Sequence, residues 1–232
     1  MSDKTGLSGV ILVGPSTRMG RDKALLELGH QTFISRLAQE LSVCDEVFVS
    51  GPSGRDYSRY GLKVVEDEHQ GIGPMEGIRQ SLRHAAANHV FICACDMPFV
   101  RREMVVYLAG FISSNYDAYV FNNEGRIHPL CGIYSRAVLP VAQAMIAEGR
   151  YRMMELLSSV RTRYVDFSGS SLPGEMLANI NTPEDYARIA GDLRPERADR
   201  GTQADGRAIS AVVTREAARF THALTGGQMR HR

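Results

Sequence analysis

The sequence has neither a charge excess nor a long hydrophobic run. Its 27 Lys and Arg residues oppose 26 Asp and Glu residues, and the formal net charge is +1. No overall field would therefore attract nucleic acid or an anionic membrane. No apolar run approaches the ~20 residues that span a bilayer, and the N-terminus opens into a strand-like segment without the apolar core of a signal peptide. We expect a cytoplasmic protein that binds neither nucleic acid nor membrane.

Cysteine is also scarce: the chain has Cys44, Cys93, Cys95 and Cys131. Four cysteines are too few for a disulfide scaffold, and none of them forms the Cys-x-x-Cys spacing of a zinc or redox site. We expect reduced, mostly buried thiols. With 232 residues, of which 44% are hydrophobic, the chain can bury a sizeable core, and one main domain is expected.

Short apolar or β-branched runs alternate with segments of helical spacing in the first half of the chain. The strand-like runs are 9–13, 46–50, 62–65, 90–95 and 118–121, and the helical segments are 33–43, 75–85 and 102–112. Such alternation predicts right-handed βαβ crossovers and a mostly parallel sheet with helices on both faces. We therefore expect a three-layer α/β/α, Rossmann-like fold that binds ligands beyond the carboxyl ends of its strands.

The rhythm changes after about residue 125. We expect strands at 129–134 and 164–167, helices at 137–147 and 150–159, and a last helix that starts at Thr182-Pro183 and runs through Ile189. The domain should span 1–192. Residues 193–232 contain eight Arg and no Lys, and we expect a flexible tail with a weak helix at 209–224.

The opening strand leads into a loop that carries Gly14, Arg18 and Lys23. A glycine turn after a buried strand lets backbone N–H groups approach phosphate oxygens, and the two cations supply the charge that a triphosphate requires. The loop has neither the Gly-Lys-Ser/Thr of a Walker A motif nor a G-x-G-x-x-G turn. We predict a phosphate-binding loop of another type.

Two further loops place acidic residues after apolar runs. Asp96 follows the run 90–95 and could hold Mg²⁺ against substrate phosphates, or it could cap the next helix. Asp67 lies in the glycine-containing loop 66–77 and could accept hydrogen bonds from a ribose or a base, or it could be an ordinary surface acid. We expect the three loops to converge on one crevice.

Four motifs in order carry a resemblance to a known family. They are Gly-Pro-Ser-Thr-Arg-Met-Gly-Arg-Asp-Lys-Ala-Leu-Leu from Gly14, Gly-Pro-Met-Glu-Gly from Gly73, Cys-Asp-Met-Pro from Cys95 and Asn-Ile-Asn-Thr-Pro-Glu-Asp from Asn179. From residue 8 to about 190 the chain resembles the molybdenum-cofactor guanylyltransferases, which are MobA-like nucleotidyltransferases. The resemblance implies magnesium-dependent transfer of GMP from GTP to the phosphate of molybdopterin or its molybdenum form, and transient contacts with cofactor-donor and acceptor molybdoenzymes.

The resemblance also implies roles for individual residues. Arg18, Lys23 and Asp96 would be catalytic, with Asp96 as the metal ligand. The nucleotide would lie against Leu12, Val13, Gly14, Lys23, Ser50, Asp67, Gly73 and Asp96. Ser50 departs from the Asn expected at that strand end. Arg152, Asn179 and Asn181 would contact the pterin substrate, whereas His128 is interpreted as a buried, hydrogen-bonded histidine.

The first loop departs from the family's pattern because only Gly14-Pro15 precedes the Ser-Thr-Arg-Met-Gly run, where two glycines and one more residue are usual. Pro15 removes one backbone N–H donor and fixes φ. Alternatives stay open. One is a CTP-dependent molybdopterin cytidylyltransferase, against which Asp22 favours guanine by resemblance, or a transferase of the same fold that uses a sugar or isoprenoid phosphate. The other is a catalytically silent nucleotide-binding or scaffold homologue.

Overall fold

The computed structural model describes residues 4–15 and 22–192. Arg18 and the predicted tail 193–232 lie outside this range. Seven strands form the central sheet: β1 (Ser8–Leu12), β4 (Glu46–Gly51), β5 (Lys63–Glu66), β6 (His89–Ala94), β7 (Ala118–Asn123), β8 (Arg126–Ser135) and β9 (Thr162–Asp166). Their order is β5-β4-β1-β6-β8-β7-β9. Only β8 runs antiparallel to its sheet neighbours, β6 and β7, so the predicted mostly parallel sheet is confirmed.

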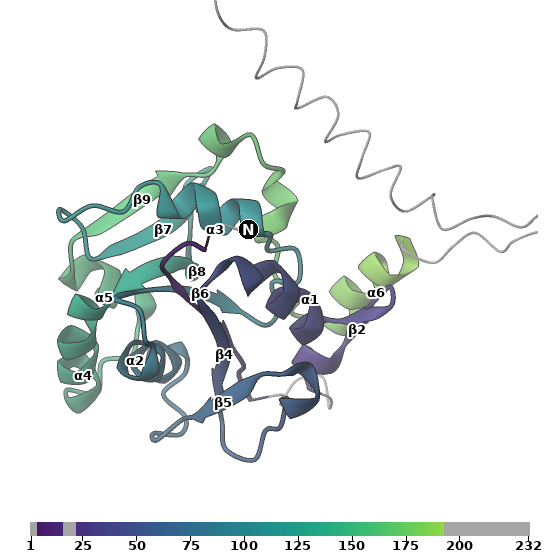
Figure 1. The fold of residues 1–232 in the computed structure, drawn as a ribbon, viewed down its shortest axis with the longest axis horizontal. Helices are drawn as coiled ribbons and strands as arrows, with labels where there is room; N and C mark the ends of the chain where they lie inside the picture. Colours follow the sequence, from purple (N-terminus) through teal and green to yellow (C-terminus); the bar gives the residue numbers. More distant parts are fainter. Residues whose placement is uncertain (1–3, 16–21, 193–232) are drawn as a thin grey trace, which may run out of the picture. The chain divides into compact units, whose positions relative to one another are not determined.

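Helices cover both faces of the sheet (Figure 1). One face packs against α1 (Phe33–Glu40) and α3 (Arg102–Ala109), and the other against α2 (Pro74–His84), α4 (Leu139–Ala147) and α5 (Met153–Ser159). Alternation along each strand sends successive side chains to opposite faces. In β1, Ile11 joins the first core and Val10 and Leu12 the second. This arrangement is the predicted three-layer α/β/α architecture.

Several predicted boundaries are corrected. Residues 41–43 form a 3₁₀ turn rather than a continuation of α1, α3 ends at Ala109 rather than at 112, and α5 begins at Met153. The helix predicted from residue 150 starts later because Arg152 has extended backbone angles. The last helix, α6 (Pro183–Asp192), extends beyond Ile189.

Strand β8 contains a proline, Pro129, which would remove a hydrogen bond from a regular ladder. Its register against β7 shifts between Val120, opposite Gly132, and Phe121, opposite His128. The intervening residues of β8 have no partner on β7, so the strand bulges where Pro129 lies.

A short hairpin, which the sequence analysis did not predict, packs against the last helix. It consists of β2 (Glu27–Leu28) and β3 (Gln31–Thr32). Leu26, Leu28, Phe33 and Ile180 form a small third core beneath α6. The Tyr186 hydroxyl donates a hydrogen bond to the Glu27 carbonyl at 2.8 Å. These contacts fix the chain around residue 180 beside the segment that follows β1.

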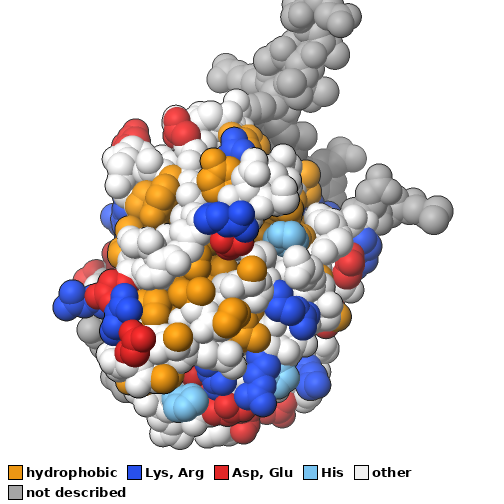
Figure 2. Space-filling model, turned by 90° about the vertical axis from the view of Figure 1, so that its left-hand side faces the viewer, with side chains coloured by type: hydrophobic (Ala, Val, Ile, Leu, Met, Phe, Trp, Pro, Cys, Tyr) orange, Lys and Arg blue, Asp and Glu red, His pale blue; other side chains and the backbone are white. Residues whose placement is uncertain are grey.

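All four cysteines are free and buried, as expected. Figure 2 shows acidic and basic side chains interspersed on one face, with hydrophobic side chains between them. Within the described part of the chain, no helix has the length and apolar content to cross a membrane.

Candidate functional site

A cavity of about 710 Å³ lies at the carboxyl ends of β1, β4, β5 and β6. In the sheet, β4 and β5 lie on one side of β1 and β6 lies on the other, so the strand order reverses at β1. Such a switch point is where open α/β sheets bind ligands. All eight residues predicted to contact the nucleotide line this cavity: Leu12, Val13, Gly14, Lys23, Ser50, Asp67, Gly73 and Asp96. The volume is within the usual range for small-molecule sites.

The floor of the cavity is built from closely approaching backbone. The Val13 N–H donates to the Ser50 carbonyl at 2.9 Å, and the Cys95 N–H donates to the Leu12 carbonyl at 2.8 Å. Glycine is required for one of these approaches: a Cβ at Gly51 would lie 2.7 Å from the Val13 carbonyl oxygen. The ends of β1, β4 and β6 are thereby held together below the ligand space.

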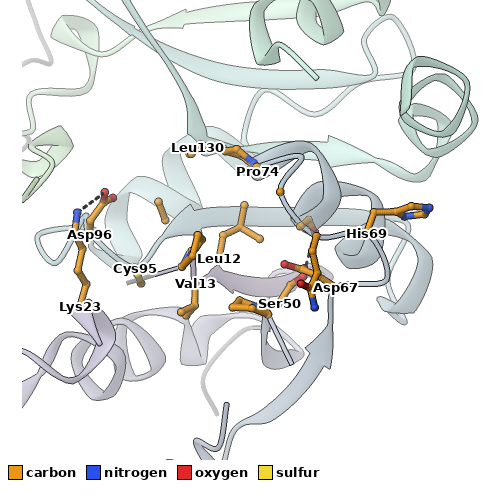
Figure 3. Close-up of a pocket in the computed structure, with 18 of the residues that line it drawn as sticks. Leu12, Val13, Lys23, Ser50, Asp67, His69, Pro74, Cys95, Asp96 and Leu130 are labelled. Atoms are coloured by element: carbon orange, nitrogen blue, oxygen red, sulfur yellow. Dashed lines mark hydrogen bonds and ion pairs between the residues drawn. The ribbon is translucent and has the colours of Figure 1, made fainter. Parts of the chain in front are cut away.

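Lys23 is positioned by the residue before it. One Asp22 carboxylate oxygen accepts from the Ala24 N–H at 3.0 Å and caps the 3₁₀ turn Lys23–Leu25. The other oxygen accepts from the buried Tyr57 hydroxyl and from Arg55, both at 2.7 Å. Asp22 therefore serves as an internal anchor in this structure. The lysine that follows it faces Asp96 (Figure 3).

Asp96 meets three groups at one end of the cavity. Its Oδ2 lies 3.8 Å from the Lys23 ammonium, its Oδ1 accepts from the Asn179 side-chain amide at 3.0 Å, and its backbone carbonyl accepts from the Ile180 N–H at 2.8 Å. Lys23 also donates to the Ile180 carbonyl at 3.2 Å. Burial raises the pKa of Asp96, while Lys23 and Asn179 act in the opposite direction.

These surroundings suit a divalent cation. The Asp96 carboxylate is largely buried, and its ammonium partner is too distant for a hydrogen bond. A hard cation would stabilise its ionised form. Mg²⁺ commonly takes one or two protein carboxylates, with substrate phosphates and water as its other ligands.

Asp67 lies on the other side of the cavity (Figure 3). Its Oδ1 is buried and has no hydrogen-bond partner among the described residues. Burial and the nearby Glu76 raise the pKa of Asp67 to about 6, against the opposing effect of Arg79. A buried acceptor without a donor is costly, so a ligand hydroxyl or N–H group would stabilise it.

The residues predicted to bind the pterin lie elsewhere. Asn179 contacts Asp96, which lines the cavity, but is not itself among the lining residues. Asn181 is exposed, and its N–H donates to the Asp185 carboxylate at 3.1 Å. Arg152 is exposed at the start of α5. None of the three lines the 710 Å³ cavity, and their role stays a prediction.

His128 is buried as interpreted, but its Nε2 has no hydrogen-bond partner among the described residues. Burial, followed by the charge of Arg126, lowers the pKa of its imidazole. The burial of His128 agrees with the interpretation, and its hydrogen bonding stays a prediction because no partner for Nε2 lies among the described residues.

Sequence reasoning missed several contributors to the site. Cys95 and Gly77 line the cavity, and a Cβ at Gly77 would come within 3.0 Å of the Leu12 side chain. Tyr57, which contacts Asp22, had no local signal, because the two are 35 residues apart. Gly77 could have been found, since it ends the quoted Gly-Pro-Met-Glu-Gly motif.

The fold and the site define a class. An open, mostly parallel sheet carries, at its switch point, a cavity with a lysine and a carboxylate at one end. On the other side lies a carboxylate oxygen that has no hydrogen-bond partner among the described residues. This arrangement is that of an α/β protein that binds a nucleotide or a similar phosphorylated ligand.

Comparison with known proteins identifies the family. The profile described as the MobA-like NTP transferase domain matches residues 9–163. The chain is 32% identical over 185 residues to a probable molybdenum cofactor guanylyltransferase of Carboxydothermus hydrogenoformans, covering 78% of this chain and 92% of that protein. It is 30% identical over 193 residues to the molybdenum cofactor guanylyltransferase of Vibrio parahaemolyticus, covering 82% and 97%.

A solved structure, molybdopterin-guanine dinucleotide biosynthesis protein A of Archaeoglobus fulgidus, has the same fold, with a TM-score of 0.68 and 24% identity over 80% of this chain and 98% of that one. The chain belongs to the MobA-like NTP transferase family and is a nucleotidyltransferase.

Proposed function

We propose that the protein transfers GMP from GTP to the phosphate of molybdopterin or the molybdenum cofactor, forming the guanine dinucleotide cofactor and diphosphate. One observation carries the proposal: the eight residues expected to contact the nucleotide, drawn from four strand ends and from the starts of the 3₁₀ turn Lys23–Leu25 and of α2, line one cavity. The names of relatives at 30–34% identity over at least 90% of their length support the choice of reaction.

The reaction requires two polyanions to meet. A phosphate oxygen of the pterin attacks the α-phosphorus of GTP in line, the bond from that phosphorus to the bridging oxygen breaks, and diphosphate leaves with the electron pair. Lys23 holds phosphate oxygens and offsets the charge that develops on them. Mg²⁺ at Asp96 would supply further charge neutralisation. The predicted role of Arg18 is the same as that of Lys23, and no covalent protein nucleophile is needed.

The nucleoside portion would lie over Leu12, Val13 and Gly14, with Asp67 accepting from base or ribose donors. The pterin phosphate would meet Arg152, which is exposed at the start of α5. Contacts with cofactor-donor and acceptor molybdoenzymes and a cytoplasmic location belong to the same proposal.

The first test is calorimetric titration with GTP, CTP and ATP in the presence of Mg²⁺. Selective GTP binding supports the proposal, whereas preference for CTP favours the cytidylyltransferase. If GTP binds without turnover, insertion of glycine before Pro15 tests the silent alternative, which predicts that activity appears only with the longer loop.

A second test uses Asp96→Asn, which retains the shape of the side chain and removes its charge. We expect kcat for dinucleotide formation to fall at least about a hundredfold, consistent with the loss of one transition-state electrostatic contact. Full magnesium-dependent turnover by this variant would overturn the assignment of Asp96.

A further inference from the structure

A buried ion pair that the proposed reaction does not use joins Glu76, in the first turn of α2, to Arg79, one turn further along the helix. The side chains of Glu76 and Arg79 are 1% and 6% exposed. Burying two charges costs free energy unless their geometry is good and further hydrogen bonds satisfy them. Such a pair beside the nucleotide cavity is therefore expected to hold a neighbouring part of the structure in place.

Glu76 holds the loop that follows β5. Its Oε1 accepts from the backbone N–H groups of Glu68 at 2.9 Å and His69 at 3.2 Å, and its Oε2 lies 3.2 Å from the His69 Nδ1. The Asp67 N–H is bonded to the Gly51 carbonyl, and the Gly73 carbonyl accepts from the Glu76 N–H. One buried carboxylate thus fixes the loop between its two ends.

Arg79 fixes that carboxylate in turn. Its Nε donates to Glu76 Oε2 at 2.9 Å, and its terminal nitrogen donates to Glu76 Oε1 at 2.7 Å and to Glu68 Oε2 at 2.8 Å. This fork geometry restricts rotation as well as supplying charge. The guanidinium offers the positive charge that a metal would otherwise bring to Glu68, His69 and Glu76.

The fixed loop forms one wall of the cavity. Asp67, His69, Gln70, Gly71 and Gly73 all line it. Figure 3 shows this wall across the cavity from Lys23 and Asp96. The loop therefore faces the nucleoside portion of the ligand, and the phosphates lie toward the other end.

We propose that Glu76, clamped by Arg79, is a positioning residue that sets the affinity for the nucleoside part of the nucleotide without taking part in phosphate binding. This inference rests on the proposed function for where the nucleotide lies. Glu76 acts through the loop backbone and through Asp67, the side chain in that wall with an unpaired acceptor.

The decisive variant is Glu76→Gln, matched with Arg83→Gln. Gln keeps the size of Glu76 but removes its charge and turns an amide toward Arg79. Arg83 lies on the same helix, and its one ion pair among the described residues is with Glu68, at 2.6 Å on the surface, where an exposed pair contributes little. The probes are GTP and inorganic tripolyphosphate, each titrated calorimetrically with Mg²⁺.

We expect the Kd for GTP to rise at least about tenfold in Glu76→Gln, with the Kd for tripolyphosphate unchanged within about twofold. Arg83→Gln should match the wild type with both probes. A general loss of structure would weaken both probes together, and this result, or unchanged GTP affinity, would overturn the inference. If Glu76→Gln does not fold, Arg79→Lys decides: it keeps the charge but loses the fork, and the same selective loss is expected.

The pH profile gives a second readout. The charged groups acting on Asp67 are Glu76 and Arg79 of α2, while the neighbouring β4 end offers the uncharged Ser50 and Gly51. Glu76→Gln removes a charge that raises the pKa of Asp67, while Arg79 keeps its ion pair with Glu68 at 2.8 Å. The pKa of Asp67 therefore falls, and the acid-side loss of GTP affinity moves to lower pH. A purely structural role would not move it.

The titration of the wild type with different nucleotides tests the proposed function. The ratio of the GTP Kd values of Glu76→Gln and the wild type tests the role of Glu76. If the wild type prefers CTP, the proposed guanylyl transfer fails, and the Glu76→Gln comparison is made with CTP. If the wild type binds tripolyphosphate but no nucleoside triphosphate, the inference fails as well.

Discussion

Replacing Gly51 with alanine tests how closely the floor of the cavity is packed. The added Cβ would lie 2.7 Å from the Val13 carbonyl oxygen and 3.2 Å from the Val13 Cβ. A backbone oxygen cannot rotate away as a side chain can, so β4 and the segment after β1 must separate. Gly51 also accepts the Asp67 N–H hydrogen bond at 2.9 Å, so the displacement reaches two walls of the cavity.

The expected cost follows from overpacking, which destabilises by about 1–3 kcal/mol. For a domain of this size the Tm then falls by about 2–12 °C. Because Val13 and Asp67 both line the cavity, we also expect the Kd for GTP to rise about tenfold, equivalent to about 1.4 kcal/mol. Differential scanning calorimetry and titration calorimetry measure the two effects.

Gly132→Ala is the matched control. A Cβ at Gly132 would lie 2.7 Å from the Tyr119 carbonyl oxygen and 2.8 Å from the Val120 side chain, so the steric conflict is comparable. Gly132 does not line the cavity. This variant should lose stability and retain GTP affinity. Equal affinity losses in both variants, or none in Gly51→Ala, would refute the link between this contact and nucleotide binding.

Two further predictions follow from the contacts of the site. Tyr57→Phe removes the 2.7 Å hydrogen bond to Asp22, and the loss of a bond to a charged group, about 1.5–3 kcal/mol, should lower the Tm by several degrees. It should also reduce kcat/KM, because Lys23 is then less firmly placed. An unchanged Tm would contradict the role of Asp22 as an anchor. Asp67 accepts hydrogen bonds best when ionised, and its pKa is raised to about 6, so GTP affinity should fall as the pH drops through about 6. Asp67→Asn should abolish this part of the pH dependence. The ionisation of GTP itself affects the wild type and Asp67→Asn equally, so the difference between their titrations reports on Asp67.

The sign of the Asp67 effect on stability is opposite to that on binding. A carboxylate whose folded pKa lies above its unfolded value of about 3.9 binds its proton more tightly in the folded state. Its contribution to folding stability is therefore present at low pH and is lost as the pH rises toward about 6.

The sheet was predictable from sequence because its strands are buried on both faces and read as continuous apolar runs. Helix ends were less predictable, since Arg152 leaves the helical region without a proline to mark the change. The β2–β3 hairpin was missed because its strands have only two residues each, too few to show an alternating pattern.

Part of the site could be predicted because some of its residues lie at or just after a strand end. Val13, Ser50, Asp67 and Asp96 do so, and the ends of neighbouring parallel strands lie at one edge of the sheet. The link between Asn179 and Asp96 spans 83 residues and depends on how α6 docks, for which no local pattern exists. The burial of Glu76 was equally hidden, although an acid and a base at i,i+3 on a helix are a recognisable pair.

The contacts of Ile180 have a consequence for how the protein is made. The ribosome synthesises β1, Lys23 and Asp96 early, but the groups that hold Asp96 and Lys23 come from Asn179 and Ile180. A nascent chain can therefore pair β1, β4, β5 and β6 well before the end of the cavity that holds Lys23 and Asp96 is complete. Translation must pass residue 180 before this end is assembled, which delays completion of the cavity until nearly the whole domain has been synthesised.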